Sequence, residues 1–293
     1  MNQLNQSEIK RISFGVKDLL VSLDQVLLTS YRAPQTVELK SDGSIVTATD
    51  KECEAVLRTG LDRLLPNTPF LGEETAPNSL THAMALLSGN HLWAVDPIDG
   101  TLNFTSQIPF FGCSVALLER QGERFVPVIG AITMPALNEL HYTFGSSVRC
   151  RDRESGSEAV VERLHAKDGG KDTIILPGSF YKHFFLTEAN KTKYNFRQFG
   201  CTMADGLFVA LGRADATLTH AHLWDFAGAF AICRHLGVSF FDCESGAELL
   251  GFQLKDFAEH SGTLSWRLNS YCLITKPSSL KKFRALAEVV RPP

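Results

Sequence analysis

The chain has 293 residues, of which 44% are hydrophobic and 21% are charged, and its formal net charge at pH 7 is −3. This is the composition of an ordinary globular protein with room for one or two subdomains. It excludes the general electrostatic attraction of basic proteins for nucleic acid or anionic membranes. No apolar run reaches the roughly 18 residues that span a bilayer.

The amino-terminal residues and the cysteines favour a cytoplasmic location. Residues 1–10 are polar and lack the apolar core of a signal peptide. The seven cysteines are dispersed and form no C-x-x-C pair. This pattern is typical of reduced, buried thiols rather than of a disulfide framework or a zinc site. We therefore expect neither a membrane nor a nucleic-acid partner.

The first half of the chain predicts two helices and then a series of strands. Apolar residues recur at helical spacing to about Arg32, with Ser7 as the expected cap. After a turn at residues 41–44, a second helix is predicted from Thr49 to about Leu65, where Pro66 ends it. Strands are predicted at residues 70–71, 92–95, 111–118, 126–133 and 140–144.

Residues 146–170 are polar and poorly patterned, so we expect the boundary between two halves of one compact catalytic unit there. The halves are residues 1–145 and 146–293. Because blocks of helices and strands alternate, the pattern indicates a layered α/β fold. The second half predicts strands at 173–176 and 216–218 and helices at 202–211, 224–236 and 278–290, with Gly212 and Gly237 as two helix stops.

The stretch Asp96-Pro97-Ile98-Asp99-Gly100-Thr101 carries the strongest chemical signal. Two carboxylates follow a buried strand, and a glycine and a hydroxyl follow them. Mg²⁺ prefers carboxylate, carbonyl and water oxygens, often with a phosphate completing its shell. If a short helix begins at Thr101, its free amides form an anion site. The stretch therefore predicts a metal-dependent enzyme that acts on a phosphate.

Other acidic positions fit this hypothesis, and each has a structural alternative. Glu73-Glu74 follow a short strand, but such a pair is also common on solvated surfaces. Asp225 is predicted at a helix start, where it could simply cap free amides. Thr47 and Asp50 form a hydroxyl–carboxylate pair that is equally compatible with a plain helix cap.

Four ordered motifs resemble those of the inositol monophosphatase family. Residues 93–104 are similar to its first signature and residues 224–229 to its second. Residues 71–75 match its Gly-Glu-Glu element, and residues 46–50 match its Val-Thr-x-x-Asp element. The resemblance implies an αβαβα sandwich, a homodimer, and hydrolysis of a small phosphate monoester that requires Mg²⁺ and is inhibited by lithium.

The resemblance also implies residue roles. Two or three Mg²⁺ ions per site are expected, with Asp96 bridging two of them. Thr101 and Asp50, supported by Thr47, would position and deprotonate the attacking water, while Gly100 and Thr101 would contact the phosphate. The implied metal ligands are Glu73, Asp96, the Ile98 carbonyl, Asp99 and Asp225.

The substrate side departs from the family pattern. The inositol-hydrolysing members have an acidic residue seven positions before the second-motif Asp, where this chain has Leu218, which cannot accept a hydrogen bond from a sugar hydroxyl. The family's glycine-rich turn is also absent from residues 145–149. Asn103-Phe104 nevertheless favours a sugar or polyol monophosphate over a nucleotide bisphosphate. The candidate substrate contacts are Gly200, Cys201, Thr202, His220, His222 and Arg197.

His220 and His222 alternate on an extended segment, so both could face the pocket, although one could be a surface residue and the other could pack on Trp224. Arg197 could equally form a structural ion pair. Fructose-1,6-bisphosphatase, histidinol-phosphatase and nucleotide 3′-phosphatase activities remain open alternatives. A regulatory or binding protein of the same fold is the alternative from another class.

Overall fold

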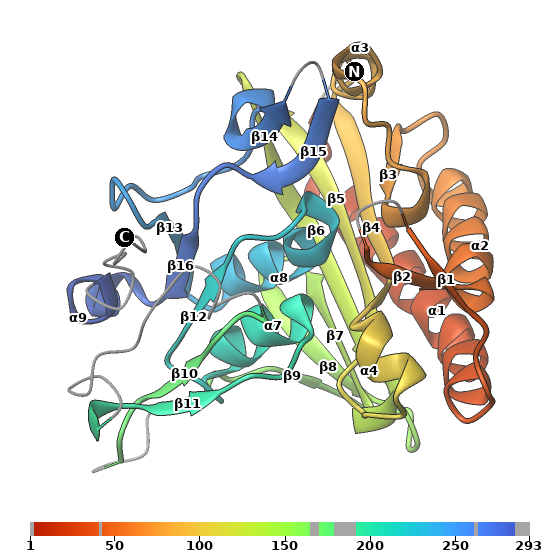
Figure 1. The fold of residues 1–293 in the computed structure, drawn as a ribbon. Coiled ribbons are helices and arrows are strands. Elements are labelled where there is room, and N and C mark those ends of the chain that lie inside the picture. The colour runs from red at the N-terminus through yellow and green to blue at the C-terminus, as the bar shows by residue number, and fades with distance from the viewer. Residues whose placement is uncertain (1–2, 41–42, 165–169, 179–191, 261–262, 285–293) are drawn as a thin grey trace.

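The computed structural model describes residues 3–40, 43–164, 170–178, 192–260 and 263–284. Figure 1 shows five stacked layers, helix, sheet, helix, sheet and helix, in the order that the resemblance implies. Helices α1 (Gln6–Tyr31) and α2 (Ala48–Leu64) form the first layer, and α7 (Thr202–Leu211) and α8 (Leu223–His235) form the central one. Helix α9 (Leu280–Arg284) lies on the outer side of the second sheet.

The larger sheet has seven strands in the order β3-β4-β5-β6-β7-β8-β9. Only β3 and β4 pair in parallel, and the other neighbours are antiparallel. The strands are β3 (Phe70–Gly72), β4 (His91–Asp99), β5 (Gly112–Gln121), β6 (Arg124–Met134), β7 (Glu139–Phe144), β8 (Ser147–Asp152) and β9 (Glu158–Val160).

The smaller sheet has the order β11-β10-β12-β16-β13, and two short ribbons, β1-β2 and β14-β15, complete the strands. These strands are β10 (Thr173–Ile175), β11 (Asn195–Arg197), β12 (Ala216–Thr219), β13 (Ser239–Asp242), β16 (Cys272–Thr275), β1 (Val37–Leu39), β2 (Ile45–Thr47), β14 (Phe257–His260) and β15 (Thr263–Leu268). The other α-helices within the described residues are α3 (Leu80–Leu86) and α4 (Thr101–Thr105).

Strand β4 is apolar on both faces because helices cover both faces of its sheet. Trp93 and Val95 belong to the core cluster beneath α1 and α2. Leu92 and Ala94 point the other way, into the cluster that contains α7 and α8. The strand is buried along its whole length, so the carboxylates at its end are largely shielded from solvent.

Helix α8 crosses the large sheet at very close range. A Cβ atom on Gly130 of β6 would lie 2.3 Å from the carbonyl oxygen of Gly228 in α8. Since no side chain fits between them, these glycines let the helix backbone approach the strand. The first turn of α8, which carries Asp225, is thereby held over the sheet.

The predicted cap of the first helix needs correction. Asn5, not Ser7, caps α1, because its side chain accepts hydrogen bonds from the amides of Ser7 and Glu8 at 2.9 and 3.0 Å. The expected boundary region also contains β8 and β9, so the large sheet runs past residue 145 to Val160. Val148 and Cys150 do alternate with polar residues in β8, but this pattern is short, and β9 has only three residues, all of them exposed.

The helices predicted at 202–211 and 224–236 are confirmed to within a residue. Helix α9 covers the start of the predicted helix 278–290, and residues 285–290 lie outside the described residues, as do residues 41–42 of the predicted turn. The sequence patterns did not predict α3 or most strands of the small sheet. Among the described residues, no helix combines the length and the apolarity that crossing a bilayer requires.

Candidate active site

Three carboxylates from three different elements meet beside the end of β4. Glu73 directly follows β3, Asp96 lies in β4, and Asp225 lies in the first turn of α8. The parallel register of β3 and β4 pairs Gly72 with Val95, so the next residue of each strand is an acid. One oxygen from each of Glu73, Asp96 and Asp225 lies within 4.8 Å of the others.

The surroundings of Asp96 and Glu73 disfavour the ionised form of their carboxyl groups. Burial raises the pKa of Asp96 well above its usual range, and the charges of Glu73 and Asp99 raise it further. Burial, followed by the charge of Asp225, likewise raises the pKa of Glu73. Buried carboxylates need a partner. A divalent cation with oxygen ligands would satisfy several of them together.

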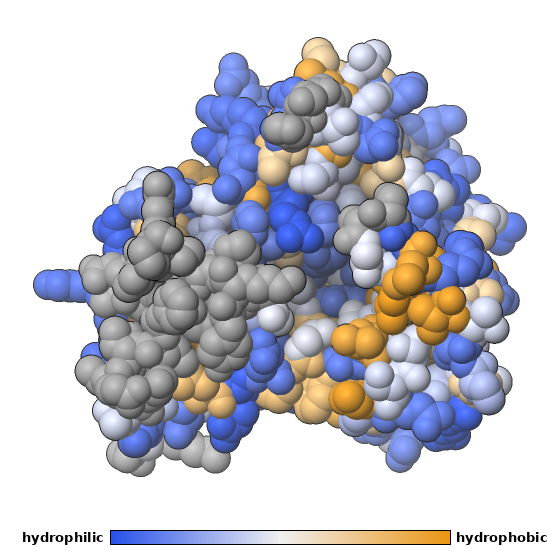
Figure 2. All heavy atoms as spheres, in the orientation of Figure 1, coloured by the Kyte–Doolittle hydropathy of each residue, from blue (hydrophilic) through white to orange (hydrophobic). Residues whose placement is uncertain are grey.

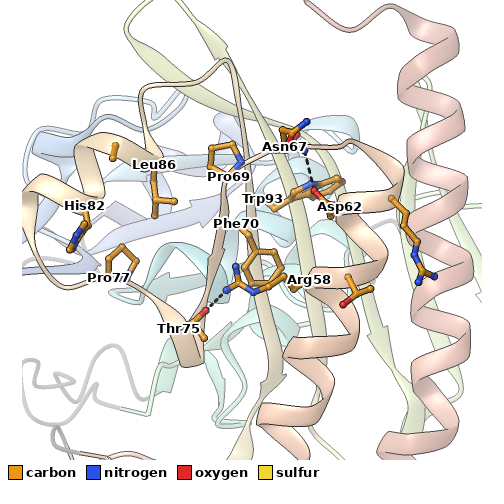
Figure 3. A pocket seen from close by; sticks show the side chains of 14 residues that line it. Arg58, Asp62, Asn67, Pro69, Phe70, Thr75, Pro77, His82, Leu86 and Trp93 are labelled. Carbon is orange, nitrogen blue, oxygen red and sulfur yellow. Dashed lines mark hydrogen bonds between the residues drawn. The ribbon is translucent and has the colours of Figure 1, made fainter.

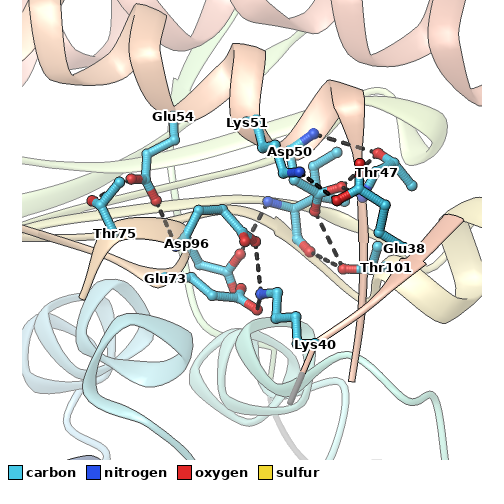
Figure 4. Close-up of polar contacts among 12 residues, drawn as sticks. Glu38, Lys40, Thr47, Asp50, Lys51, Glu54, Glu73, Thr75, Asp96 and Thr101 are labelled. Carbon is cyan, nitrogen blue, oxygen red and sulfur yellow. Dashed lines mark hydrogen bonds and ion pairs between the residues drawn. The ribbon is translucent and has the colours of Figure 1, made fainter. Parts of the chain in front are cut away.

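The ammonium of Lys40 already pairs with this acidic group (Figure 4). Its Nζ lies 2.7 Å from Oε1 of Glu73 and 2.8 Å from Oε1 of Glu74. Glu74 is also held through its backbone, since its amide donates to Glu54 at 2.8 Å. A cation is therefore bound at Glu73 in this structure, and it comes from the chain itself.

Asp99 stands beside the three clustered carboxylates. Its carboxylate accepts a hydrogen bond from the amide of Met203, in the first turn of α7. Burial and then the charge of Asp225 raise the pKa of Asp99 to about 8. Asp99 and Ile98 line the same cavity as the cluster, and the Ile98 carbonyl accepts a hydrogen bond from the Thr101 hydroxyl at 2.9 Å.

The pair Thr47 and Asp50 caps α2 and also contacts Thr101, which lines the acidic cavity. Asp50 accepts hydrogen bonds from the Thr47 hydroxyl at 2.5 Å and the Thr47 amide at 2.8 Å, as in a capping box. Its other oxygen accepts from the Thr101 hydroxyl at 3.4 Å (Figure 4). Burial raises the pKa of Asp50. The capping reading is confirmed, and the same side chains form a hydroxyl–carboxylate chain that ends at Thr101.

The acidic cluster opens into a cavity of about 480 Å³ that includes Gly100, Thr101, His222 and Arg267. Gly100 has a φ of +84°, and a Cβ there would lie 2.7 Å from the Phe110 carbonyl oxygen. Only glycine suits this turn, which starts the short helix α4 as predicted. Figure 2 shows a hydrophilic hollow at the centre of this face, with an apolar patch beside it.

A second cavity of about 270 Å³ adjoins the first, and the two share Asp225 and Arg267. The predicted substrate residues Gly200, Cys201, Thr202 and His220 all line this second cavity.

Two other predicted substrate residues, His222 and Arg197, do not line the second cavity. His222 lines the first cavity, with its ring stacked on Trp224 at 4.8 Å between centroids. The ring of His220 stacks on Tyr271 at 4.6 Å. Arg197 borders neither cavity, because its strand β11 is the edge of the small sheet. Its guanidinium bonds the neighbouring Phe196 carbonyl at 2.8 Å, so its position gives no support for a substrate role.

The structure brings four further residues to the two cavities that the sequence patterns did not predict: Lys40, Asp205, Thr219 and Arg267. An acid such as Asp205 inside an otherwise apolar helix was a usable signal. Strand alternation next to Leu218 could have indicated Thr219. Nothing in the sequence indicates that Arg267, on a distant ribbon, lies at the boundary between the cavities.

A larger cavity of about 990 Å³ lies between α2, β3 and α3 and contains none of the clustered acids (Figure 3). One of its cationic side chains, Arg58, already has interaction partners within the chain. The guanidinium lies over the ring of Phe70 at 4.1 Å and bonds the Thr75 hydroxyl at 2.5 Å. The volume of a cavity therefore does not identify the active site here. The candidate metal ligands and most candidate substrate contacts line the two smaller cavities.

The chain is similar to a known protein family and to solved structures of the same fold. The model of the inositol monophosphatase family matches residues 10–276. The chain is 31% identical to inositol-1-monophosphatase of Mesorhizobium japonicum, over 73% of this chain and 78% of that protein. It is 27% identical to the fructose-1,6-bisphosphatase/inositol-1-monophosphatase of Thermotoga maritima, over 87% and 92% of the two chains.

A solved IMPase/NADP phosphatase complexed with Mg²⁺ and phosphate has the same fold, with a TM-score of 0.74. It covers 95% of each chain at 19% identity.

Proposed function

This chain belongs to the inositol monophosphatase family and is a phosphatase of that type, and we propose that it hydrolyses a small sugar or polyol monophosphate in a reaction that requires Mg²⁺. The observation that carries the proposal is the meeting of Glu73, Asp96 and Asp225 oxygens within 4.8 Å. All these donors are oxygens, which suits a hard divalent cation. Asp99 and the Ile98 carbonyl complete the proposed ligand set for two or three ions.

Bound there, Mg²⁺ would supply positive charge against the phosphoryl oxygens and make water a better nucleophile. The protein's part is to hold and move the proton. The Thr101 hydroxyl lies between the Ile98 carbonyl and Asp50. We assign Thr101 to orienting the water and Asp50 to accepting its proton, with Thr47 fixing the Asp50 carboxylate.

The phosphate is proposed to lie at Gly100 and Thr101, where the backbone turns away from the end of β4. Its leaving group would extend past Asp225 into the second cavity, toward Gly200, Cys201 and Thr202.

We also propose a homodimer. Val37, Leu39 and Leu102 leave large apolar side chains exposed on this chain, and light scattering would establish the oligomeric state.

The direct test measures phosphate release from a panel of inositol, sugar, histidinol and nucleotide phosphates, with and without Mg²⁺. We expect activity only with Mg²⁺ and a preference for a polyol or sugar phosphate. Asp96→Asn should lower kcat at least a thousandfold while the thermal melting profile stays cooperative. A folded wild-type protein that releases no phosphate from any substrate would favour the regulatory alternative.

A further inference from the structure

Two residues that line the second cavity carry buried polar atoms that no described residue satisfies. The two residues are Asp205 of α7 and Thr219 of β12, which are 5% and 3% exposed. Neither Oδ1 of Asp205 nor the hydroxyl of Thr219 has a hydrogen-bond partner among the described residues. An unpaired buried polar atom is unfavourable, so two such residues in the lining of one cavity point to a polar ligand.

Strand alternation separates Thr219 from its neighbour Leu218. Leu218 is 1% exposed and belongs to the apolar cluster with Ile174, Leu273 and Phe283. Successive residues of a strand face opposite sides, so the next side chain, Thr219, points away from that cluster. The hydrogen-bonding capacity that is absent at Leu218 is therefore present one position later, and Asp205 adds a carboxyl group.

The size and walls of the cavity restrict the ligand further. About 270 Å³ is small compared with the roughly 300–1,000 Å³ of pockets for drug-sized ligands. The described lining contains no Phe, Tyr or Trp on which a nucleobase could stack, and the ring of His220 is already stacked on Tyr271. Arg267 is the only Arg or Lys among the described lining residues, and it lies at the boundary shared with the acidic cavity. Among the described residues, a second phosphate deep in this cavity would therefore find no Arg or Lys beside it.

We propose that Asp205 and Thr219 determine substrate specificity by hydrogen-bonding the hydroxyl groups of a neutral, monosaccharide-sized leaving group. This inference rests on the proposed function, and it names which residues distinguish a polyol phosphate from other monoesters. A buried site that hydrogen-bonds a substrate hydroxyl rejects analogues that lack it, because its own polar atoms would then stay unpaired.

The test compares kcat/KM for myo-inositol 1-phosphate with kcat/KM for 4-nitrophenyl phosphate, whose leaving group carries no hydroxyl substituent. We expect Thr219→Val and Asp205→Leu each to lower the ratio of the two values at least tenfold. Thr219→Ser and Asp205→Asn keep hydrogen-bonding groups and should stay within about threefold of the wild-type ratio. The matched control is Thr217→Val, on the same strand and in the lining of the same cavity, because the Thr217 hydroxyl already bonds the Leu218 carbonyl at 3.4 Å and is not an unpaired group.

A ratio that changes less than threefold in folded Thr219→Val overturns the proposal, whether or not Asp205→Leu folds. A wild-type protein that hydrolyses 4-nitrophenyl phosphate but none of several polyol phosphates also overturns it, while leaving the phosphatase function intact. Only a wild-type protein inactive on every phosphate would contradict the proposed function itself.

Discussion

The ammonium of Lys40 lies 2.7 Å from a carboxylate oxygen of Glu73, one of the three acids that converge at the end of β4. This ion pair neutralises part of a buried negative cluster from within the chain. A metal ion that binds through Glu73 must compete with the ammonium or displace it. The affinity of the site for cations therefore depends on a residue that the motifs do not include.

Replacing Lys40 by Gln should increase the affinity of the site for Mg²⁺. Removing a positive charge beside Glu73 leaves more negative charge for the ion, and a partly exposed ion pair is worth about 1 kcal/mol or less. We expect the Mg²⁺ concentration for half-maximal activity to fall about threefold to fivefold, as measured by titrating Mg²⁺ into a phosphate-release assay. Lys51→Gln, which removes a surface pair with Glu38 at 2.6 Å, is the control. A higher Mg²⁺ requirement in Lys40→Gln would contradict the competition.

Thr101→Ala should impair the chemical step with little effect on stability. Its hydroxyl joins Asp50 to the Ile98 carbonyl, and general-base catalysis typically contributes 10²–10⁴-fold. We expect kcat to fall about 100-fold and Thr101→Ser to retain activity within about threefold. Thr105→Ala is a matched control, since that hydroxyl of the same helix bonds only the Leu102 carbonyl among the described residues. Equal loss in Thr101→Ala and Thr101→Ser would exclude the hydroxyl as the cause.

Thr47→Ala should affect both stability and turnover, because Thr47 caps α2 and holds Asp50. Loss of an N-cap typically costs about 1 kcal/mol, which thermal or urea unfolding would measure. We expect kcat to fall in the same variant because Asp50 loses its positioning partner. Unchanged kcat together with reduced stability would show that Thr47 is a cap alone.

Asp24→Asn should remove a pH-dependent loss of stability that is independent of the metal site. Burial raises the pKa of Asp24 to about 6, although Thr133 donates to its carboxylate at 2.6 Å. The unfolded carboxyl titrates near its usual 3.8. Between these values the folded state keeps a proton that the unfolded state has lost. The free energy of unfolding therefore falls as pH rises from about 4 to about 6, and it stays lower above that range.

At pH 7.5, Asp24→Asn should consequently be more stable than the wild type by about 1–3 kcal/mol, with no such gain near pH 4. Urea unfolding at several pH values would measure this difference. Glu52→Gln on the exposed face of α2 should show no comparable change. A difference that does not grow with pH would mean that Asp24 is not the titrating group.

Lithium should inhibit the enzyme in the millimolar range, as the family resemblance implies. Phosphatase activity measured against LiCl, with NaCl at equal ionic strength as the control, would test this. Activity that LiCl and NaCl affect equally would count against carrying this family property over to the chain.

The sequence by itself determined the elements that carry the chemistry. The acids near 73, 96 and 225 lie in short, specific motifs, and the helices that follow Thr47, Gly200 and His222 have strong periodicity or clear stops. Local patterns of this kind act through hydrogen bonds and spacing within a few residues. These elements can therefore be predicted from the sequence without knowledge of the fold.

Only the tertiary structure decided which distant residues complete the site. Lys40 reaches Glu73 from the β1–β2 ribbon, Arg267 borders the cavities from the β14–β15 ribbon, and Arg197 lies away from both. Counting back seven positions from Asp225 identified Leu218, whereas of the two neighbours in β12 that line the second cavity it is Thr219 that carries an unpaired hydroxyl. Such contacts depend on strand register and on the packing of layers. Residue types and spacing within one segment do not specify either of these.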